Sequence, residues 1–500
     1  MHEKRNVLEY LEASACLRAD HSAVADGATI CTYAHLQHLS RKVGSALISR
    51  GFAGRPVVVL MEKSTQALAI MLGALYAGGY YVPVDPSVPE ERLRNLCSAL
   101  EGPLVVFNET ASQSVWCLPS HVDTVDSVQL FESAIDSENL RAVRAKARDT
   151  DIAYVLFTSG STGEPKGIAI SHRAIIAFIE SFVEAFGFDA SDRFANQAPF
   201  DFDVSVKDIY GALATGATLV LVPRTLFSTP VALLDYLEDQ RVTVLVWAVA
   251  ALCLFTSFHA LDGRTLFYVR HVLFSGEVMP SRPLNQWLCA APNARFANVY
   301  GPTEITCNCL YHPIDRSRNY ESGVPLGQSF SHCRVMLIDK DERPLVEPGV
   351  LGEIVVSGPS LARGYVGNSE LTRCVFGPLR DAASDECFYR TGDLAVYSSA
   401  GELFYRGRRD NQVKRQGHRI ELEEVDLAIE RMDDVNRCRC VFDKQTKRLT
   451  AFYEGGAERA GVLRQARHLL PAYMVPNKFV QVDHFPLNKN GKIDRKELCR

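Results

Sequence analysis

The sequence has no long run of charges of one sign. Its 54 Lys and Arg residues and 59 Asp and Glu residues leave a formal net charge of −5. Proteins that bind nucleic acids usually carry an excess of basic residues on one face or segment. This chain shows no such excess, so we expect no nucleic-acid partner. A composition of 47% hydrophobic and 23% charged residues is typical of globular proteins. A length of 500 residues exceeds what one compact domain usually needs.

The sequence also lacks an apolar segment suited to export or to a membrane. The N-terminus, MHEKRNVLEYLEAS, has no hydrophobic core of signal-peptide length, so we expect a cytoplasmic location. Two apolar stretches, 67–84 and 242–258, are near the lower limit for a span, about 17 to 25 residues. Gly78, Gly79 and Pro83 interrupt the first stretch. The second begins with β-branched residues, which indicates a buried strand followed by a helix. No membrane partner is expected.

Metal-binding cysteine spacings are absent. The 14 cysteines are scattered, and the close pairs Cys307/Cys309 and Cys438/Cys440 are C-x-C rather than C-x-x-C. In a chain without an export signal, we expect reduced thiols rather than a disulfide framework or a metal cage.

What is present is an alternation of apolar strand patterns and amphipathic helix patterns, which is typical of wound α/β layers. From Val324 onward, short strands separated by Gly and Pro indicate a β-rich subdomain. The charged segment 406–419 has too few apolar residues to lie in a core, and it marks a boundary. We therefore predict an α/β core domain over 1–407, a domain boundary at 408–410 and a small α+β domain over 411–500.

The segment FTSGSTGEPKG, Phe157–Gly167, follows the apolar run IAYVL. Its four hydroxyls, its exposed backbone N–H groups and Lys166 are suited to phosphate. It is not a Walker A loop, because Glu164 and Pro165 separate Gly163 from the lysine. A solvated surface loop is the alternative interpretation.

This segment resembles the signature loop of the adenylate-forming superfamily, which includes adenylation domains of nonribosomal peptide synthesis, acyl-CoA synthetases and luciferases. Further segments resemble the family's motifs, in the family's order, and extend the resemblance over nearly the whole chain. They are LYAGGYYVPVDP (Leu75–Pro86), NVYGPTEIT (Asn298–Thr306), GEIVVSGPSLARGY (Gly352–Tyr365), YRTGD (Tyr389–Asp393), GRRDNQVKRQGHRIELEEVD (Gly407–Asp426) and NKNGKIDR (Asn488–Arg495).

The resemblance implies that ATP and Mg²⁺ are bound. A carboxylate oxygen would attack the α-phosphate, form an acyl-AMP and release pyrophosphate. The residues implied in ATP binding are Thr158, Ser159, Gly160, Ser161, Thr162, Lys166, Asn298, Tyr300, Gly301, Thr303, Asp393, Arg408 and Lys414. Tyr300 would stack on adenine with Asn298 near its amino edge, and Asp393 would accept the ribose hydroxyls with Arg408 and Lys414 beside it. Glu304 would ligate the metal.

The resemblance also implies a mobile C-terminal domain. Lys492 matches the catalytic lysine that stabilises negative charge between carboxylate and α-phosphate. The domain would then rotate about Asp410 and present the QGHR loop to a phosphopantetheine thiol.

Asp203 falls where amino-acid-activating members of the family hold the substrate's ammonium group. A buried charge needs a partner, so an aspartate there favours an amino acid over a fatty or aryl acid. The alternative is that Asp203 caps or orders the local turn. The remaining positions that the resemblance assigns to the substrate pocket are Val204, Lys207, Ala250, Leu273, Ser275, Val299, Cys307 and Asn308.

Two of these residues bear on the identity of the acid. The segments FDVSVKDIY and FSGEVMP resemble the D-alanine–carrier protein ligases, but Ser275 stands where those ligases carry cysteine. If Lys207 points into the pocket, it could pair with an acidic or hydrogen-bonding side chain; if it pairs with Asp208 or faces solvent, it is uninformative. A small L-amino acid is the first expectation and an acidic one the second.

Because the chain ends shortly after Lys492, we expect a free-standing ligase that passes its aminoacyl group to a separate carrier protein. Two alternatives are an acyl- or aryl-CoA synthetase of the same superfamily, which would not need Asp203, and a nucleotide-binding regulator without catalysis. Lys492, Glu304 and Asp393 together argue against the regulator.

Overall fold

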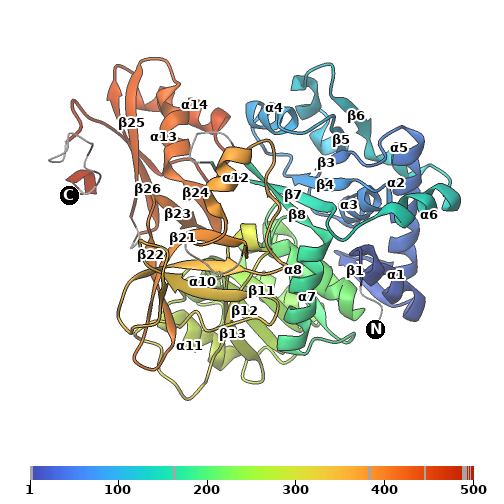
Figure 1. Ribbon diagram of the computed structural model, residues 1–500, viewed down its shortest axis with the longest axis horizontal. Helices are drawn as coiled ribbons and strands as arrows, with labels where there is room; N and C mark the ends of the chain where they lie inside the picture. The colour runs from blue at the N-terminus through green and yellow to red at the C-terminus, as the bar shows by residue number, and fades with distance from the viewer. Residues whose placement is uncertain are drawn as a thin grey trace. The chain divides into compact units, whose positions relative to one another are not determined.

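The computed structural model describes residues 4–160, 165–380, 385–443, 446–486, 493, 495 and 497–499 (Figure 1). Its contacts divide the chain into two compact units, each described here by itself. Unit 1 comprises Met1–Pro86, Leu100–Leu156 and Ile168–Arg409, and unit 2 comprises Ser87–Ala99, Phe157–Gly167 and Asp410–Arg500. The division after Arg409 falls within the segment expected to be a hinge. Unit 2 also takes up two segments that the sequence-based prediction placed in the core domain.

The largest sheet of unit 1 has nine strands in the order β15-β14-β13-β12-β11-β9-β10-β1-β2. The strands are β15 (Gln328–Ser329), β14 (Leu310–Pro313), β13 (Arg295–Tyr300), β12 (His271–Ser275), β11 (Val244–Ala248), β9 (Arg193–Asn196), β10 (Thr218–Leu221), β1 (Ser22–Asp26) and β2 (Thr29–Thr32). The run from β13 to β1 is parallel. β11 and β12 are buried along their whole length. Parallel strands covered on both faces are apolar throughout, which explains the long apolar stretch over 242–258.

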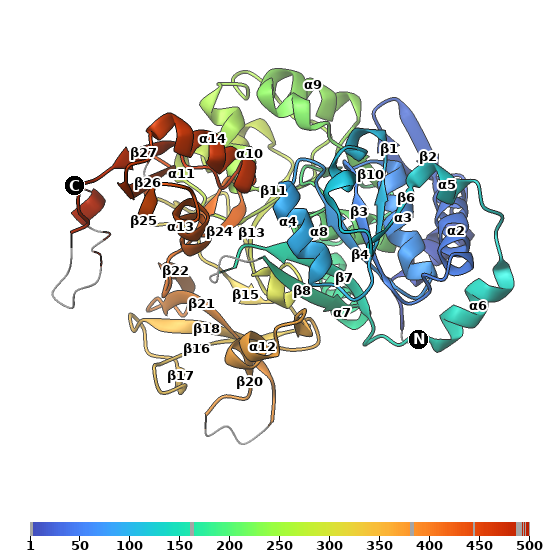
Figure 2. The same ribbon diagram turned by 90° about the horizontal axis from the view of Figure 1, so that it is seen from above.

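A second sheet has seven strands in the order β19-β8-β7-β4-β3-β5-β6. They are β19 (Gly364–Tyr365), β8 (Lys166–Ser171), β7 (Ile152–Thr158), β4 (Tyr80–Val84), β3 (Pro56–Leu60), β5 (Leu104–Phe107) and β6 (Asp123–Asp126). The helices of unit 1 are α1 (Leu8–Leu17), α2 (Tyr33–Ser49), α3 (Thr65–Tyr76), α5 (Ser127–Phe131), α6 (Ser137–Lys146), α7 (His172–Phe186), α8 (Val204–Thr215), α9 (Pro230–Asp239), α10 (Val249–Ser257), α11 (Ser281–Ala290) and α12 (Ser369–Val375). α7 and α8, drawn in green, lie side by side (Figures 1 and 2).

The helices α7 and α8 begin and end at residues suited to those positions. Ser171 caps α7 by accepting a hydrogen bond from the backbone N–H of Ala174. Gly187 and Gly216 end α7 and α8 in the left-handed conformation that glycine adopts most easily. In the part of the chain that the structure describes, no helix is both long enough and apolar enough to cross a bilayer.

The third sheet of unit 1 is antiparallel and corresponds to the β-rich texture expected after Val324. It follows the order β17-β16-β18-β21-β20, and β22 also pairs with β21. Its strands are β16 (Arg334–Ile338), β17 (Pro344–Leu345), β18 (Gly352–Ser357), β20 (Phe376–Gly377), β21 (Phe388–Tyr397) and β22 (Leu403–Arg408). Figure 2 shows α12 along β20 and β21.

Unit 2 is a small α+β body. It contains the hairpin β23 (Gln412–Arg415) and β24 (His418–Glu421), and a sheet of β25 (Val435–Asp443), β26 (Arg448–Gly455) and β27 (Lys478–Gln481). Its helices are α4 (Glu90–Ser98), α13 (Leu422–Glu430) and α14 (Arg459–Leu469). Apolar side chains of α13, α14 and the three-stranded sheet form its core.

Candidate active site

Asp203 stands at the start of α8, in the turn that follows β9. It is 9% exposed, and its Oδ2 accepts a hydrogen bond of 2.8 Å from the Thr303 hydroxyl. The Asp203 side chain makes no capping hydrogen bond to the helix. The structure therefore gives no support to the capping alternative, and it directs the carboxylate toward the segment 301–308.

The segment 301–308 is held in an unusual backbone conformation. Thr306 and Cys307 have φ values of 57° and 73°, and the N–H of Asn308 bonds to the carbonyl of Thr306 at 3.1 Å. A positive φ is rare for a β-branched residue, and such conformations concentrate at functional sites. A Cβ on Gly301 would lie 2.5 Å from the Cys307 carbonyl oxygen and 2.6 Å from the Asn308 Cα. Glycine is therefore required where the turn packs back on the end of β13.

This turn brings Cys307 and Asn308 against α8. The Cys307 thiol lies 3.2 Å from the Asp203 carbonyl oxygen. The ammonium of Lys207 donates a hydrogen bond of 3.1 Å to Asn308 Oδ1. Lys207 is only 1% exposed, so it does not face solvent.

Asp208 does not form an ion pair with the neighbouring lysine. Its Oδ2 accepts a hydrogen bond of 3.1 Å from the Asn196 amide. Burial raises the pKa of Asp208 to about 8, although the ammonium groups of Lys207 and Lys63 act in the opposite direction. The Lys63 ammonium is held by the carbonyl oxygens of Asn196 and Gln197, at 2.8 and 3.0 Å.

The other side chains predicted to line the substrate pocket belong to the same part of unit 1. Leu273 and Ser275 are buried on β12, Val299 is buried on β13 and Val204 is buried in the first turn of α8. Ala250 lies in α10 and is half-buried. Their contact with a substrate stays a prediction.

Asp393 on β21 collects three donors. Tyr300 donates to Oδ2 at 2.5 Å, while Arg408 and Tyr405 donate to Oδ1 at 2.9 and 3.5 Å. Burial and the neighbouring Asp393 charge hold the pKa of Tyr300 well above its usual range, so this phenol stays protonated. Tyr300, Asp393 and Arg408 were all predicted from the motifs to bind the nucleotide, and the structure brings them together. Tyr405, which belongs to β22, was not predicted from the sequence.

Glu304 lies in the short helical turn Thr303–Ile305 and is fully buried. Its Oε1 accepts a hydrogen bond of 2.8 Å from the Tyr365 hydroxyl. Carboxylate oxygens are ligands that Mg²⁺ prefers, so this residue fits a metal site chemically. Asn298 is 9% exposed and donates its amide to the Pro325 carbonyl at 2.9 Å, which fixes the orientation of the side chain.

The loop that follows β7 belongs to unit 2 and contacts carboxylates of the same unit. The N–H of Gly160 donates to Glu424 Oε2 at 2.8 Å, and Lys166 Nζ lies 3.5 Å from Glu421 Oε1. The Ser159 hydroxyl bridges the carbonyl of Arg419 and the N–H of Glu421, at 3.0 and 3.1 Å. These are the kinds of group expected to bind phosphate, and here they hold the protein's own anions.

The Thr158 hydroxyl is buried, and among the described residues it has no hydrogen-bond partner. Arg92 of α4 forms an ion pair with Glu424 and so anchors this carboxylate. Lys414 lies on β23 of unit 2, and Asp410 is the first residue of the C-terminal part of that unit. Three predicted site residues, Ser161, Thr162 and Lys492, fall outside the described residues.

A group of buried tyrosines lies near the substrate positions and was not identified from the sequence. Tyr81 and Tyr210 share a hydrogen bond of 3.0 Å between their hydroxyls. The rings of Tyr81 and Tyr154 stack at 5.6 Å. Burial is the main cause that raises the pKa of Tyr154, with the thiol of Cys307 and the carboxylate of Asp203 as further causes. Tyr81 lies in the segment LYAGGYYVPVDP, which resembles a family motif, and this motif could have indicated that Tyr81 lies near the site.

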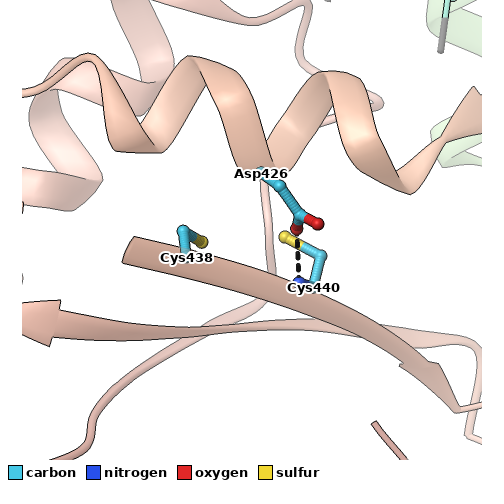
Figure 3. Close-up of side chains that lie close together, drawn as sticks. All are labelled: Asp426, Cys438 and Cys440. Atoms are coloured by element: carbon cyan, nitrogen blue, oxygen red, sulfur yellow. Dashed lines mark hydrogen bonds between the residues drawn. The ribbon is translucent and has the colours of Figure 1, made fainter. Parts of the chain in front are cut away.

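A second cluster, in unit 2, has the composition of a metal site but not its chemistry. Asp426 on α13 faces Cys438 and Cys440, which project from β25 on the same side (Figure 3). The carboxylate already accepts from the Cys440 N–H and from Arg495, each at 2.5 Å. Burial raises the pKa of the Cys440 thiol well above its usual range, which disfavours the thiolate that a metal requires. We therefore assign these cysteines to the core of unit 2.

Comparison with known proteins identifies the family of the chain. Residues 11–366 match the model of the AMP-binding enzymes. The chain is 31% identical to the D-alanine–D-alanyl carrier protein ligase of Listeria monocytogenes, over 99% of this chain and 98% of the relative. It is 32% identical to zwittermicin A synthase ZmaJ of Bacillus cereus, over 94% and 90% of the two chains. Other relatives are far longer: the chain spans 19% of a mycosubtilin synthase chain of Bacillus subtilis and 9% of a linear gramicidin synthase chain of Brevibacillus parabrevis.

Solved structures agree with the sequence comparison. The crystal structure of IdnL1 has a TM-score of 0.82 and 29% identity, and covers 97% of this chain and 100% of that chain. The holo form of PA1221, a protein with adenylation and PCP domains, has a TM-score of 0.84 and 26% identity, with 99% and 84% coverage. The predicted resemblance and the predicted mixed α/β fold are thus confirmed. The chain belongs to the family of AMP-binding enzymes, as a member similar to carrier protein ligases and to adenylation domains.

Proposed function

We propose that this chain activates an amino acid with ATP and then transfers it to the phosphopantetheine thiol of a separate carrier protein. In the first step a carboxylate oxygen of the amino acid attacks the α-phosphorus of ATP. The bond between the α-phosphorus and the bridging oxygen breaks, and pyrophosphate leaves with the electron pair. In the second step the thiol attacks the acyl carbonyl, a proton leaves the sulfur, and AMP departs as the thioester forms.

The motifs assign a role to each residue of the site, and the contacts of the described residues support these roles. Asp393 would accept the ribose hydroxyls, since Tyr300 and Arg408 already orient its two oxygens. Glu304 would hold Mg²⁺, which would offset the charge of the phosphates. The loop at Thr158–Gly160 and Lys166 would bind the departing phosphates once Glu421 and Glu424 withdraw. Lys492 would stabilise charge between the carboxylate and the α-phosphate.

The observation that carries the proposal is the buried carboxylate of Asp203. It lies 9% exposed beside Cys307 and Thr303, within the set of side chains predicted to line the substrate pocket. A buried carboxylate is suited to a cationic partner, which the ammonium of an amino acid supplies and a fatty acid does not. The relatives support transfer to a carrier: one is named for a D-alanyl carrier protein, and another contains a PCP domain.

The test is the exchange of labelled pyrophosphate into ATP, with a panel of amino acids, fatty acids and aryl acids. We expect exchange with an amino acid, and Asp203→Asn should lower kcat/KM by about two to four decades, the loss for breaking a buried charge pair. Asp341→Asn, on an exposed turn, is the matched control and should leave the rate unchanged. Exchange with a fatty or aryl acid alone, unaffected by Asp203→Asn, would favour a CoA synthetase and overturn the proposal.

A further inference from the structure

Lys207 is the most deeply buried ammonium group near the predicted substrate positions, at 1% exposure. Among the residues that the structure describes, its side chain makes a single hydrogen bond, to the neutral amide oxygen of Asn308 at 3.1 Å. Within the described chain, no carboxylate oxygen lies at ion-pair distance from its Nζ. A buried charge with one neutral partner is costly, so the site is suited to a further anionic partner.

The adjacent carboxyl does not supply that partner. Asp208 bonds to the Asn196 amide, and with its pKa raised to about 8 it is mostly protonated at neutral pH. The Lys63 ammonium also lowers the pKa of this carboxyl, but burial outweighs it. The positive charge of Lys207 is therefore not balanced by its sequence neighbour.

Lys207 and Asp203 lie on one face of the polypeptide at the start of α8, four residues apart. The turn 306–308 packs along that face, because Cys307 contacts the carbonyl of Asp203 and Asn308 contacts Lys207. Besides burial, the Asp203 carboxylate raises the pKa of the Cys307 thiol and the Lys207 ammonium lowers it, so both charges lie near this thiol. The turn therefore meets a carboxylate and an ammonium on the same stretch of chain.

We propose that Lys207 and Asn308 recognise the side-chain carboxylate of an acidic amino acid, while Asp203 holds its ammonium. This assignment rests on the function proposed above and names the substrate class of the same site. The substrate's ammonium and side-chain carboxylate would each face a protein group of opposite charge. Asn308 fixes the Lys207 ammonium in place, and its own amide N–H₂ is a second donor for the same carboxylate. The α-carboxylate remains available for adenylation.

The decisive measurement compares each acid with its amide under pyrophosphate exchange: aspartate with asparagine and glutamate with glutamine, in both stereochemical forms, with glycine and alanine alongside. An amide has the size of the acid but lacks the charge. We expect kcat/KM for one acid to exceed that for its amide by about 10²–10³-fold, as expected for a buried charge-assisted contact. This ratio needs no variant, so it decides the proposal even if substitutions unfold the protein.

Two variants locate the effect. Lys207→Met keeps much of the side-chain volume and should reduce the acid-to-amide ratio by about 10²-fold, mainly through loss of the acid. Lys146→Met, on the exposed end of α6, is the matched control and should preserve the ratio. A neutral amino acid as the preferred wild-type substrate would overturn this inference and leave the proposed function standing. Exchange with fatty or aryl acids alone would overturn both.

Discussion

Replacement of Gly301 by alanine tests whether the turn 301–308 needs a residue without a side chain at this position. The new Cβ would lie 2.5 Å from a backbone oxygen and 2.6 Å from a backbone Cα. Restoring an ordinary contact of 3.4 Å requires a shift of 3.4 − 2.5 = 0.9 Å in backbone that is already strained at Thr306 and Cys307. Overpacking of this kind costs about 1–3 kcal/mol.

The perturbation should also reach the substrate contacts, because Cys307 and Asn308 are the residues that must move. We therefore expect Gly301→Ala to lower the free energy of unfolding of unit 1 by about 1–3 kcal/mol. It should also raise KM for the amino acid, with a smaller effect on KM for ATP. The assays are denaturant unfolding followed by tryptophan fluorescence, and pyrophosphate exchange with each substrate varied in turn.

The matched control is Gly377→Ala on β20 of the same unit, where a Cβ would meet nothing within 4 Å and φ is not positive. This variant should unfold within about 0.5 kcal/mol of the wild type, as surface substitutions usually do. Equal stability of Gly301→Ala and Gly377→Ala, with unchanged KM values, would refute the claim that Gly301 is required for the turn.

Three further changes test other parts of the molecule. Asp393→Asn should raise KM for ATP at least about 30-fold in the exchange assay, because one amide cannot accept from Tyr300 and Arg408 as the carboxylate does; an unchanged KM would exclude Asp393 from nucleotide binding. The Asp208 carboxyl has a pKa of about 8 in the folded protein, against 3.8 for an exposed carboxyl. The protonated carboxyl therefore stabilises the fold at low pH, and this contribution to stability is lost as the pH rises through 8. Asp208→Asn should therefore gain stability relative to wild type between pH 5 and 8, by at most about 1.4 kcal/mol per pH unit in urea unfolding; a constant difference would contradict the raised pKa. Glu421→Gln with Glu424→Gln should tighten inorganic pyrophosphate binding about fivefold by calorimetry, which corresponds to about 1 kcal/mol; weaker binding would show that these carboxylates do not compete with phosphates.

The sequence was sufficient to predict the family, the wound α/β architecture and the β-rich subdomain. These depend on local patterns: apolar strands such as 244–248, amphipathic helices, and motifs whose residues are close in sequence. The positions of Asp203, Glu304 and Asp393 in buried surroundings agree with the motifs that indicated them. Their catalytic roles stay predictions until the assays above are made.

The sequence was not sufficient where partners are far apart in the chain. Lys207 and Asn308 are 101 residues apart, and nothing local indicates that the lysine is buried rather than solvated. The positive φ values of Thr306 and Cys307 occur where the turn packs closely against Gly301, and side-chain propensity does not reveal them. Likewise, Ser159 and Gly160 meet residues about 260 positions later, so the carboxylate contacts of the loop were not foreseen.

Those carboxylate contacts have a consequence for the direction of the reaction. Glu421 and Glu424 belong to the same chain as the loop that they occupy, so they act as a tethered competitor whose effective concentration is of millimolar order. A free diphosphate in solution would have to displace them before it could return to the loop. Under the proposed function, these two carboxylates would therefore oppose the back reaction. While both carboxylates occupy the loop, an acyl-adenylate would be protected from attack by pyrophosphate until the phosphopantetheine thiol reacts with it.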